Sequence, residues 1–159
     1  MILKLRIDDR LLHGQIAYSW KSALGYNAIV IANDGAAADN FRKNVIKMCC
    51  PEGVKLATRS LEEAAALLNH PKLKDMKVFA VCQSPADANW LLQHMEEKPV
   101  VNLGGIQMAE GKKLFSRAVY LDEEDLKNLD EIAGRGYVIE VQEVPATTMS
   151  KYTDLRKKM

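Results

Sequence analysis

Residues 6–16 read RIDDRLLHGQI and separate two segments of different periodicity. The segment Ile2–Ile7, which overlaps their first two positions, predicts a first β-strand, and a helical pattern begins at about Gly14. The loop between the two therefore lies at the carboxyl end of a strand, where open α/β sheets bind their ligands. Because this loop contains two carboxylates, Arg10 and His13, it is also the first candidate for a functional site.

His13 and Arg10 together favour phosphate chemistry. A histidine ring nitrogen acts as a nucleophile near neutral pH, and the planar fork of an arginine binds a phosphoryl group. The helix that starts at Gly14 and Gln15 directs its amide groups and its positive end toward the same anion. We therefore interpret His13 as a phosphorylated nucleophile, Arg10 as a phosphate clamp, and Gly14 and Gln15 as supporting residues. The alternative is a core or capping histidine beside a surface ion pair.

Asp8 and Asp9 place negative charge next to a site that must hold an anion. Because like charge repels a phosphoryl group, we expect these two supporting residues to orient Arg10 or the backbone of the loop. Paired carboxylates are also typical of acid–base hydrolysis or of a Mg²⁺ site. We favour that alternative less, because no further acidic residue is tied to the pair by sequence.

The same eleven residues, followed by Trp20, resemble the active-site loop of the IIB components of the mannose-class sugar phosphotransferase system. This family includes mannose, fructose, sorbose and N-acetylgalactosamine systems, and the resemblance continues more weakly over the whole length. It implies a single IIB domain at residues 1–159. It also implies that His13 accepts a phosphoryl group from a phosphohistidine of a IIA partner and transfers it to a sugar during uptake by the IIC and IID membrane components. No metal or cofactor is required, because the donor is already a phosphoramidate.

Beyond the loop, short apolar strands alternate with helices, which predicts an open, mostly parallel sheet with helices on both faces. The last strand, Tyr137–Val144, has mixed polarity and suits an antiparallel edge. Thr147 or Thr148 is expected to start a short closing helix. An earlier helix is marked by Phe41, Val45 and Met48. The other predicted strands are Tyr26–Ala32, Val54–Thr58, Met76–Cys82, Pro99–Leu103 and Ala118–Leu121.

Several polar or glycine residues follow the predicted strands and are candidates for the rim of the site. A fold of this class gathers some strand ends around one crevice. Turn and helix-capping chemistry is the alternative, and it explains Asp34 and Ser84 fully. Paired glycines are more suggestive, since bare backbone can approach a phosphate. The candidate rim residues are Asn33, Asp34, Ser84, Gly104 and Gly105, with residues 105–113 as a flexible loop beside them.

Composition excludes several classes of function. The 22 basic and 21 acidic residues nearly balance, and no basic face or arm indicates nucleic-acid binding. No apolar run has the length of a membrane span, and no signal peptide is evident, so we expect a cytoplasmic protein peripherally associated with a membrane transporter. The three cysteines, an odd number, are expected to be reduced thiols. A non-catalytic module that binds a phosphorylated metabolite is the competing hypothesis.

Overall fold

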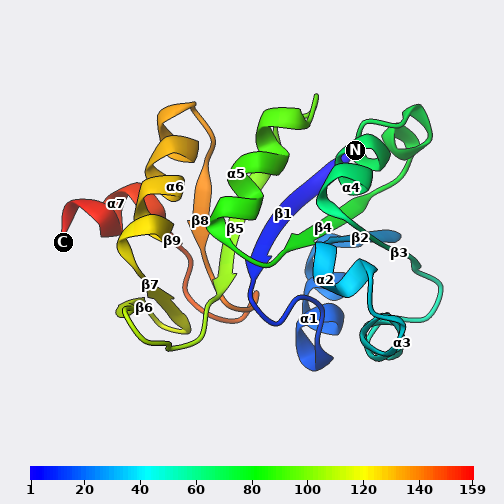
Figure 1. The fold of residues 1–159 in the computed structure, drawn as a ribbon, viewed down its shortest axis with the longest axis horizontal. Coiled ribbons are helices and arrows are strands. Elements are labelled where there is room, and N and C mark those ends of the chain that lie inside the picture. The colour runs from blue at the N-terminus through cyan, green and yellow to red at the C-terminus, as the bar shows by residue number, and fades with distance from the viewer.

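The computed structural model describes residues 1–159 and is built around a seven-stranded sheet (Figure 1). The strand order is β3-β2-β4-β1-β5-β8-β9, and only the β8–β9 pair is antiparallel. The predicted open, mostly parallel sheet is therefore confirmed, as is an antiparallel edge. The strands are β1 (Ile2–Asp8), β2 (Ala28–Ala32), β3 (Lys55–Arg59), β4 (Val78–Cys82), β5 (Val100–Gly105), β8 (Ile139–Val141) and β9 (Ser150–Lys151).

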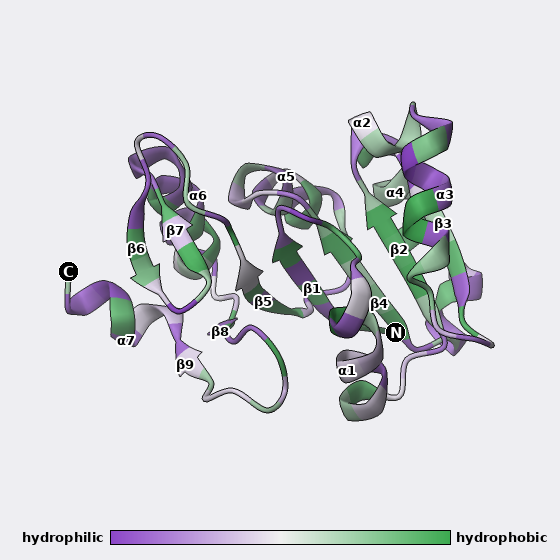
Figure 2. Cartoon of the chain, turned by 90° about the horizontal axis from the view of Figure 1, so that it is seen from below, coloured by the Kyte–Doolittle hydropathy of each residue, from purple (hydrophilic) through white to green (hydrophobic).

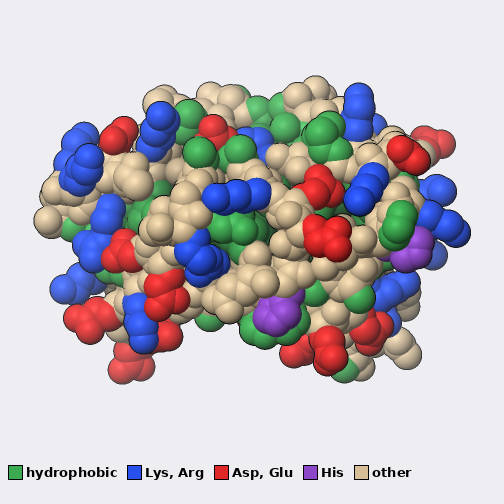
Figure 3. Space-filling view, turned by 90° about the horizontal axis from the view of Figure 1, so that it is seen from above, with side chains coloured by type: hydrophobic (Ala, Val, Ile, Leu, Met, Phe, Trp, Pro, Cys, Tyr) green, Lys and Arg blue, Asp and Glu red, His purple; other side chains and the backbone are tan.

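Helices cover both faces of this sheet. In Figure 1, α4, α5 and α6 lie above it, whereas α1 and α3 lie below it. The face seen from above carries interspersed acidic and basic side chains, without a large region of one sign (Figure 3). The helices are α1 (Gly14–Leu24), α2 (Asp34–Ala37), α3 (Asn40–Met48), α4 (Leu61–Leu68), α5 (Pro85–His94), α6 (Glu123–Gly134) and α7 (Tyr152–Lys157), with a 3₁₀ turn at Pro71–Asp75.

The central strands are buried on both faces, which explains their continuous apolar sequences. In β2, Val30 packs into the hydrophobic cluster under α4 and α5, while Ile29 and Ile31 pack into the cluster under α1. Figure 2 shows hydrophobic colour along β2 and mostly hydrophilic colour on α7. The helix α1 contributes Ile16 and Trp20 to the second cluster, so burial fixes its first turn against the end of β1.

The C-terminal third differs from its predicted arrangement. The strand expected at Ala118–Leu121 is β7 (Val119–Leu121), and it pairs with β6 (Lys113–Ser116) in a separate antiparallel sheet. The strand expected at Tyr137–Val144 is shortened to β8, which is parallel to β5 and does not form the edge. The prediction that this strand is the antiparallel edge was wrong, since β9 occupies that place.

One smaller prediction was also wrong. Thr147 does not start the closing helix, because its hydroxyl and amide groups bond to Val144 and close a turn instead. That helix, α7, begins at Tyr152. The helix predicted from Phe41, Val45 and Met48 is confirmed as α3; Phe41 and Met48 are 78% and 83% exposed, and Ile46 is buried toward the sheet.

Candidate functional site

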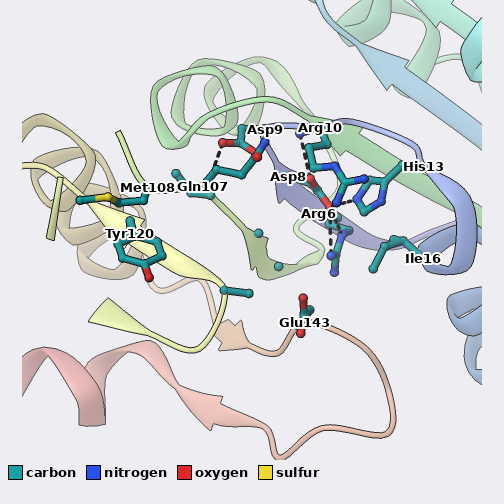
Figure 4. Close-up of a pocket in the computed structure, with 14 residues that line it drawn as sticks. Arg6, Asp8, Asp9, Arg10, His13, Ile16, Gln107, Met108, Tyr120 and Glu143 are labelled. Carbon is teal, nitrogen blue, oxygen red and sulfur yellow. Dashed lines mark hydrogen bonds and ion pairs between the residues drawn. The ribbon is translucent and has the colours of Figure 1, made fainter. Parts of the chain in front are cut away.

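The candidate site lies at the topological switch point of the sheet, at the carboxyl ends of β1 and β5. The chain leaves β1 toward β2 and leaves β5 toward β8, so the connections of these two neighbouring strands diverge at their carboxyl ends. Open α/β sheets bind ligands at such a point. A cavity of about 390 Å³ lies there, and the loop at residues 8–13 forms one wall (Figure 4). Residues 104–108 form another wall.

His13 is held by a carboxylate rather than by the helix that it precedes. Its backbone occupies the N-cap position of α1, but its side chain makes no capping hydrogen bond. Instead, Nε2 lies 2.9 Å from Oδ2 of Asp8. Since an ionised carboxylate only accepts hydrogen bonds, the Nε2 that faces it carries the hydrogen, and the lone pair of the neutral imidazole is on Nδ1. The side chain is 22% exposed and lines the cavity, so the imidazole is accessible to a bound group.

Asp8 is buried at the centre of this arrangement. Its Oδ1 accepts the backbone N–H of Arg10 at 2.9 Å, and its Oδ2 accepts two hydrogen bonds from Arg6. Burial alone would raise the pKa of Asp8, but the hydrogen bond with His13 and the charge of Arg6 outweigh burial and lower it. Asp8 is therefore a carboxylate that contacts both the loop and the imidazole. Its hydrogen bond to the loop backbone is the contact that the sequence analysis expected.

Arg6 is a buried residue of the candidate site that the sequence analysis did not single out. Its side chain is 1% exposed, and it donates to Asp8 and, at 2.7 Å, to Oδ1 of Asn102. Burial lowers the pKa of its guanidinium, while the Asp8 carboxylate opposes that shift. A Cβ at Gly104 would overlap the guanidinium, so this glycine makes room for Arg6. The available signal was a charged residue in the middle of a strand whose neighbours are apolar.

Arg10 is exposed at the mouth of the cavity and has no ion-pair partner within the chain. Its side chain is therefore free to bind an anion beside His13. Three residues further along the chain, His13 directly precedes the start of α1. There Gly14 adopts φ +22°, and the amides of Gly14 and Gln15 have no acceptor in the chain. First-turn amides of this kind attract anions. The predicted clamp and helix start thus lie beside the same histidine.

Leu11 holds the loop in a costly backbone conformation. Its φ is +58°, in the left-handed region that non-glycine residues avoid at a cost of roughly 1–3 kcal/mol. Its side chain is 1% exposed and packs with Leu12 in the cluster under α1. Its N–H also donates to the carbonyl of Asp8 at 2.9 Å. Burial of both leucines therefore fixes the turn that brings His13 back to Asp8.

The remaining walls come from segments far away in the sequence. Asp9 does not face Asp8; its carboxylate accepts the backbone N–H of Gln107 at 2.8 Å and ties the two loops together. Met108 and Tyr120 lie on the side of the cavity opposite His13, and Glu143 approaches from the loop after β8 (Figure 4). The loop at residues 105–113 was predicted to lie beside the site, and its Gln107 and Met108 do line the cavity. Tyr120 and Glu143 were not predicted, because no local pattern relates their segments to the first loop.

Three of the predicted rim residues lie outside the cavity. Asn33 caps α2 and reaches the loop only through Gln83, which donates to the carbonyl of Asp9. Asp34 accepts the backbone N–H of Leu61, and Ser84 caps α5. The cap and turn alternative therefore accounts for all three. Gly104 and Gly105 do line the cavity.

The paired-carboxylate alternative has no geometric support. Asp8 and Asp9 point to different partners, and no group of three or more His, Cys, Asp or Glu side chains is placed to hold a metal ion. The three cysteines are free thiols, with Cys82 buried. None of the helices is both long and apolar enough to cross a bilayer.

Fold and site thus define an α/β domain with an accessible histidine and a free arginine at a topological switch point. The family model for the phosphotransferase (PTS) system sorbose subfamily IIB component matches residues 2–159. The chain belongs to this family, and the predicted resemblance is confirmed.

Similar proteins carry related names. The chain is 32% identical over 139 residues to the sorbose-specific EIIB component of Klebsiella pneumoniae, covering 87% of this chain and 85% of that protein. It is 31% identical over 154 residues to the mannose-specific EIIAB component of Escherichia coli K12, covering 97% of this chain but 48% of that protein. The chain therefore spans about half the length of the EIIAB relatives.

A solved structure shares the fold over the full length. The IIBSor domain of the sorbose permease from Klebsiella pneumoniae superposes with a TM-score of 0.93 and is 29% identical in sequence. The match covers 100% of this chain and 98% of that one. The sheet and helices described above are therefore those of the family.

Proposed function

We propose that this chain is a phosphocarrier IIB component in which His13 receives a phosphoryl group from a phosphohistidine of a IIA partner and transfers it to a sugar. The observation that carries this proposal is the contact between Nε2 of His13 and Asp8, which leaves Nδ1 as the nucleophilic nitrogen. The reaction class is protein-phosphohistidine–sugar phosphotransfer. Arg10 and the first-turn amides of α1 bind the phosphoryl oxygens.

In the first step, the lone pair on Nδ1 of His13 attacks the phosphorus of the donor. The P–N bond of the donor breaks, and its electron pair returns to the donor imidazole. His13 becomes a positively charged phosphoimidazole whose Nε2–H remains bonded to Asp8, so the carboxylate stabilises the new charge. In the second step a sugar hydroxyl oxygen attacks the phosphorus, the P–Nδ1 bond breaks, and the hydroxyl proton is released. Positioning and charge stabilisation supply the catalysis.

The names of the relatives support the partners. The E. coli relative is called an EIIAB component, which is consistent with a IIA domain as donor, and the similar IIBSor structure is a domain of a permease. Membrane IIC and IID components are then the site of sugar transfer, and this chain works on the cytoplasmic side, peripherally associated with them. Relatives named for mannose, sorbose and N-acetylgalactosamine leave the sugar open. Their shared system disfavours a non-catalytic metabolite sensor.

The test is phosphorylation by the phosphoenolpyruvate-driven carrier chain that ends in the cognate IIA protein. The wild-type chain should gain one phosphate on His13, detected by mass spectrometry under alkaline conditions, in which phosphohistidine survives. His13→Ala should fold normally and gain none. His94→Ala, which changes an exposed histidine on α5, is the matched control and should be phosphorylated like the wild type. Full phosphorylation of His13→Ala would contradict the proposal.

A further inference from the structure

Asn102 lies in the middle of β5 and is 0% exposed, although its neighbours along the strand are apolar. A buried amide of this kind is costly unless all of its polar atoms are bonded. Its amide nitrogen donates to the carbonyl of Gln142 at 2.9 Å and to that of Glu140 at 3.4 Å. These carbonyls belong to β8 and to the residue just after it. The opposite end of the amide faces Arg6.

The orientation of this amide is unambiguous. A guanidinium only donates hydrogen bonds and a backbone carbonyl only accepts them, so Oδ1 must face Arg6 and Nδ2 must face the β8 carbonyls. The 2.7 Å contact with Oδ1 fixes one terminal nitrogen of Arg6, while Nε and the other terminal nitrogen both bind Oδ2 of Asp8. The guanidinium therefore cannot rotate without losing a bond at one of its ends.

We infer that Asn102 is a positioning residue that selects the reactive nitrogen of His13. Asn102 anchors Arg6, Arg6 holds Oδ2 of Asp8, and Oδ2 accepts the hydrogen bond donated by Nε2–H of His13. Each link is a directional hydrogen bond. The side chains of Asn102, Arg6 and Asp8 are nearly or fully buried, and only that of His13 is partly exposed. The lone pair is thereby kept on Nδ1. This inference rests on the proposed function only where the position of the phosphate is measured. The tautomer of His13 can be measured in the protein without any phosphate.

The test compares two buried asparagines. Asn102→Ala removes the side chain that anchors Arg6. Asn102→Ser keeps a small polar side chain, but the serine hydroxyl lies about one bond length short of the position of Oδ1, so it also loses the contact with Arg6. Asn89→Ala is the matched control: Asn89 is 4% exposed and also has several side-chain partners, but these lie on α5 and α6. The ¹⁵N chemical shifts of the His13 ring report the tautomer in the unphosphorylated proteins.

Wild type and Asn89→Ala should hold His13 in the Nε2–H tautomer, and both Asn102 variants should populate the other tautomer measurably. After phosphorylation, only the Asn102 variants should carry some phosphate on Nε2. Their transfer rate should fall by about tenfold, the lower end of the loss that follows when hydrogen-bond partners of metal-bound histidines are mutated, with unchanged binding of the IIA donor. A folded Asn102→Ser variant with the wild-type tautomer would overturn the inference, as would an equal change in Asn89→Ala. An unphosphorylated wild type with the predicted tautomer would instead contradict the proposed function alone.

Discussion

The loop after β1 and the loops after β2 and β4 end neighbouring strands and carry similar residues, yet they do different work. After β1, the carboxylate of Asp8 is held from behind by Arg6 and turns a histidine toward a cavity. After β2 and β4, Asn33 and Ser84 bond to the first turns of their own helices. Polar residues at a strand end therefore do not define a site. The buried charge within the strand makes the difference.

The largest expected effect comes from removing the negative charge of Asp8, which distinguishes the loop after β1 from the other two loops. Asp8→Asn should slow transfer to His13 by between ~10² and ~10⁴-fold, the range seen for general acid–base groups and for carboxylates that orient a histidine. Rapid-quench transfer from the phosphorylated IIA protein measures it. Ser84→Ala removes a helix cap instead and should cost only ~1 kcal/mol of stability with no change in rate. Similar rates for Asp8→Asn and Ser84→Ala would show that the two loops are equivalent.

Substitutions at two adjacent glycines distinguish the effect of crowding Arg6 from the effect of adding a methyl group elsewhere in the cavity. Gly104→Ala places a methyl group on the guanidinium of Arg6 and should destabilise the protein by about 1–3 kcal/mol while slowing transfer. Gly105→Ala brings its methyl group to 3.6 Å from the Asp8 carboxylate, an ordinary contact, and should change little. Urea unfolding and transfer rates measure both variants. Equal behaviour of the two would contradict the account of Gly104.

A smaller effect is expected at the mouth of the cavity. Arg10→Lys keeps the charge but loses the planar fork, so transfer should slow by about tenfold with unchanged stability. The exposed Arg117, which only approaches Glu143 at 3.7 Å, offers a control in Arg117→Lys with a wild-type rate. A wild-type rate in Arg10→Lys would reduce Arg10 to a surface residue.

The smallest effect concerns acid stability. Because the pKa of Asp8 is lower in the folded chain than in the unfolded chain, its contribution is fully present above the ordinary carboxyl pKa of about 3.9. That contribution is lost as the pH falls from there through the folded pKa. The urea midpoint of the wild type should therefore fall more steeply below pH 4 than that of Asp8→Asn. Parallel curves would show that Asp8 is not stabilised by its partners.

The core of the fold could be predicted because the central strands are buried on both faces and the helices alternate with them. The edge could not, since β9 has two residues and β6 has four, too few for a periodic pattern. Their positions depend on Tyr152 packing against the distant hairpin, where its ring lies tilted against that of Phe115 with 5.5 Å between the centroids. Local sequence carries no information about such contacts.

The first loop could be predicted because Asp8, Arg10 and His13 are close in sequence. Arg6 and Asn102 could not be paired, since they are 96 residues apart. Each is a polar residue inside an apolar central strand, which signals a buried partner without naming it. The sheet register pairs them directly, and that register follows only from the assembled fold.

The most direct test is to find which nitrogen of His13 carries the phosphate in the phosphorylated wild-type chain. Long-range ¹H–¹⁵N NMR, with the coupling of nitrogen to phosphorus, distinguishes the two positions. Since Asp8 accepts a hydrogen bond from Nε2–H, the phosphate should be on Nδ1, with Nε2 still protonated. Phosphate on Nε2, or on a residue other than His13, would contradict the account.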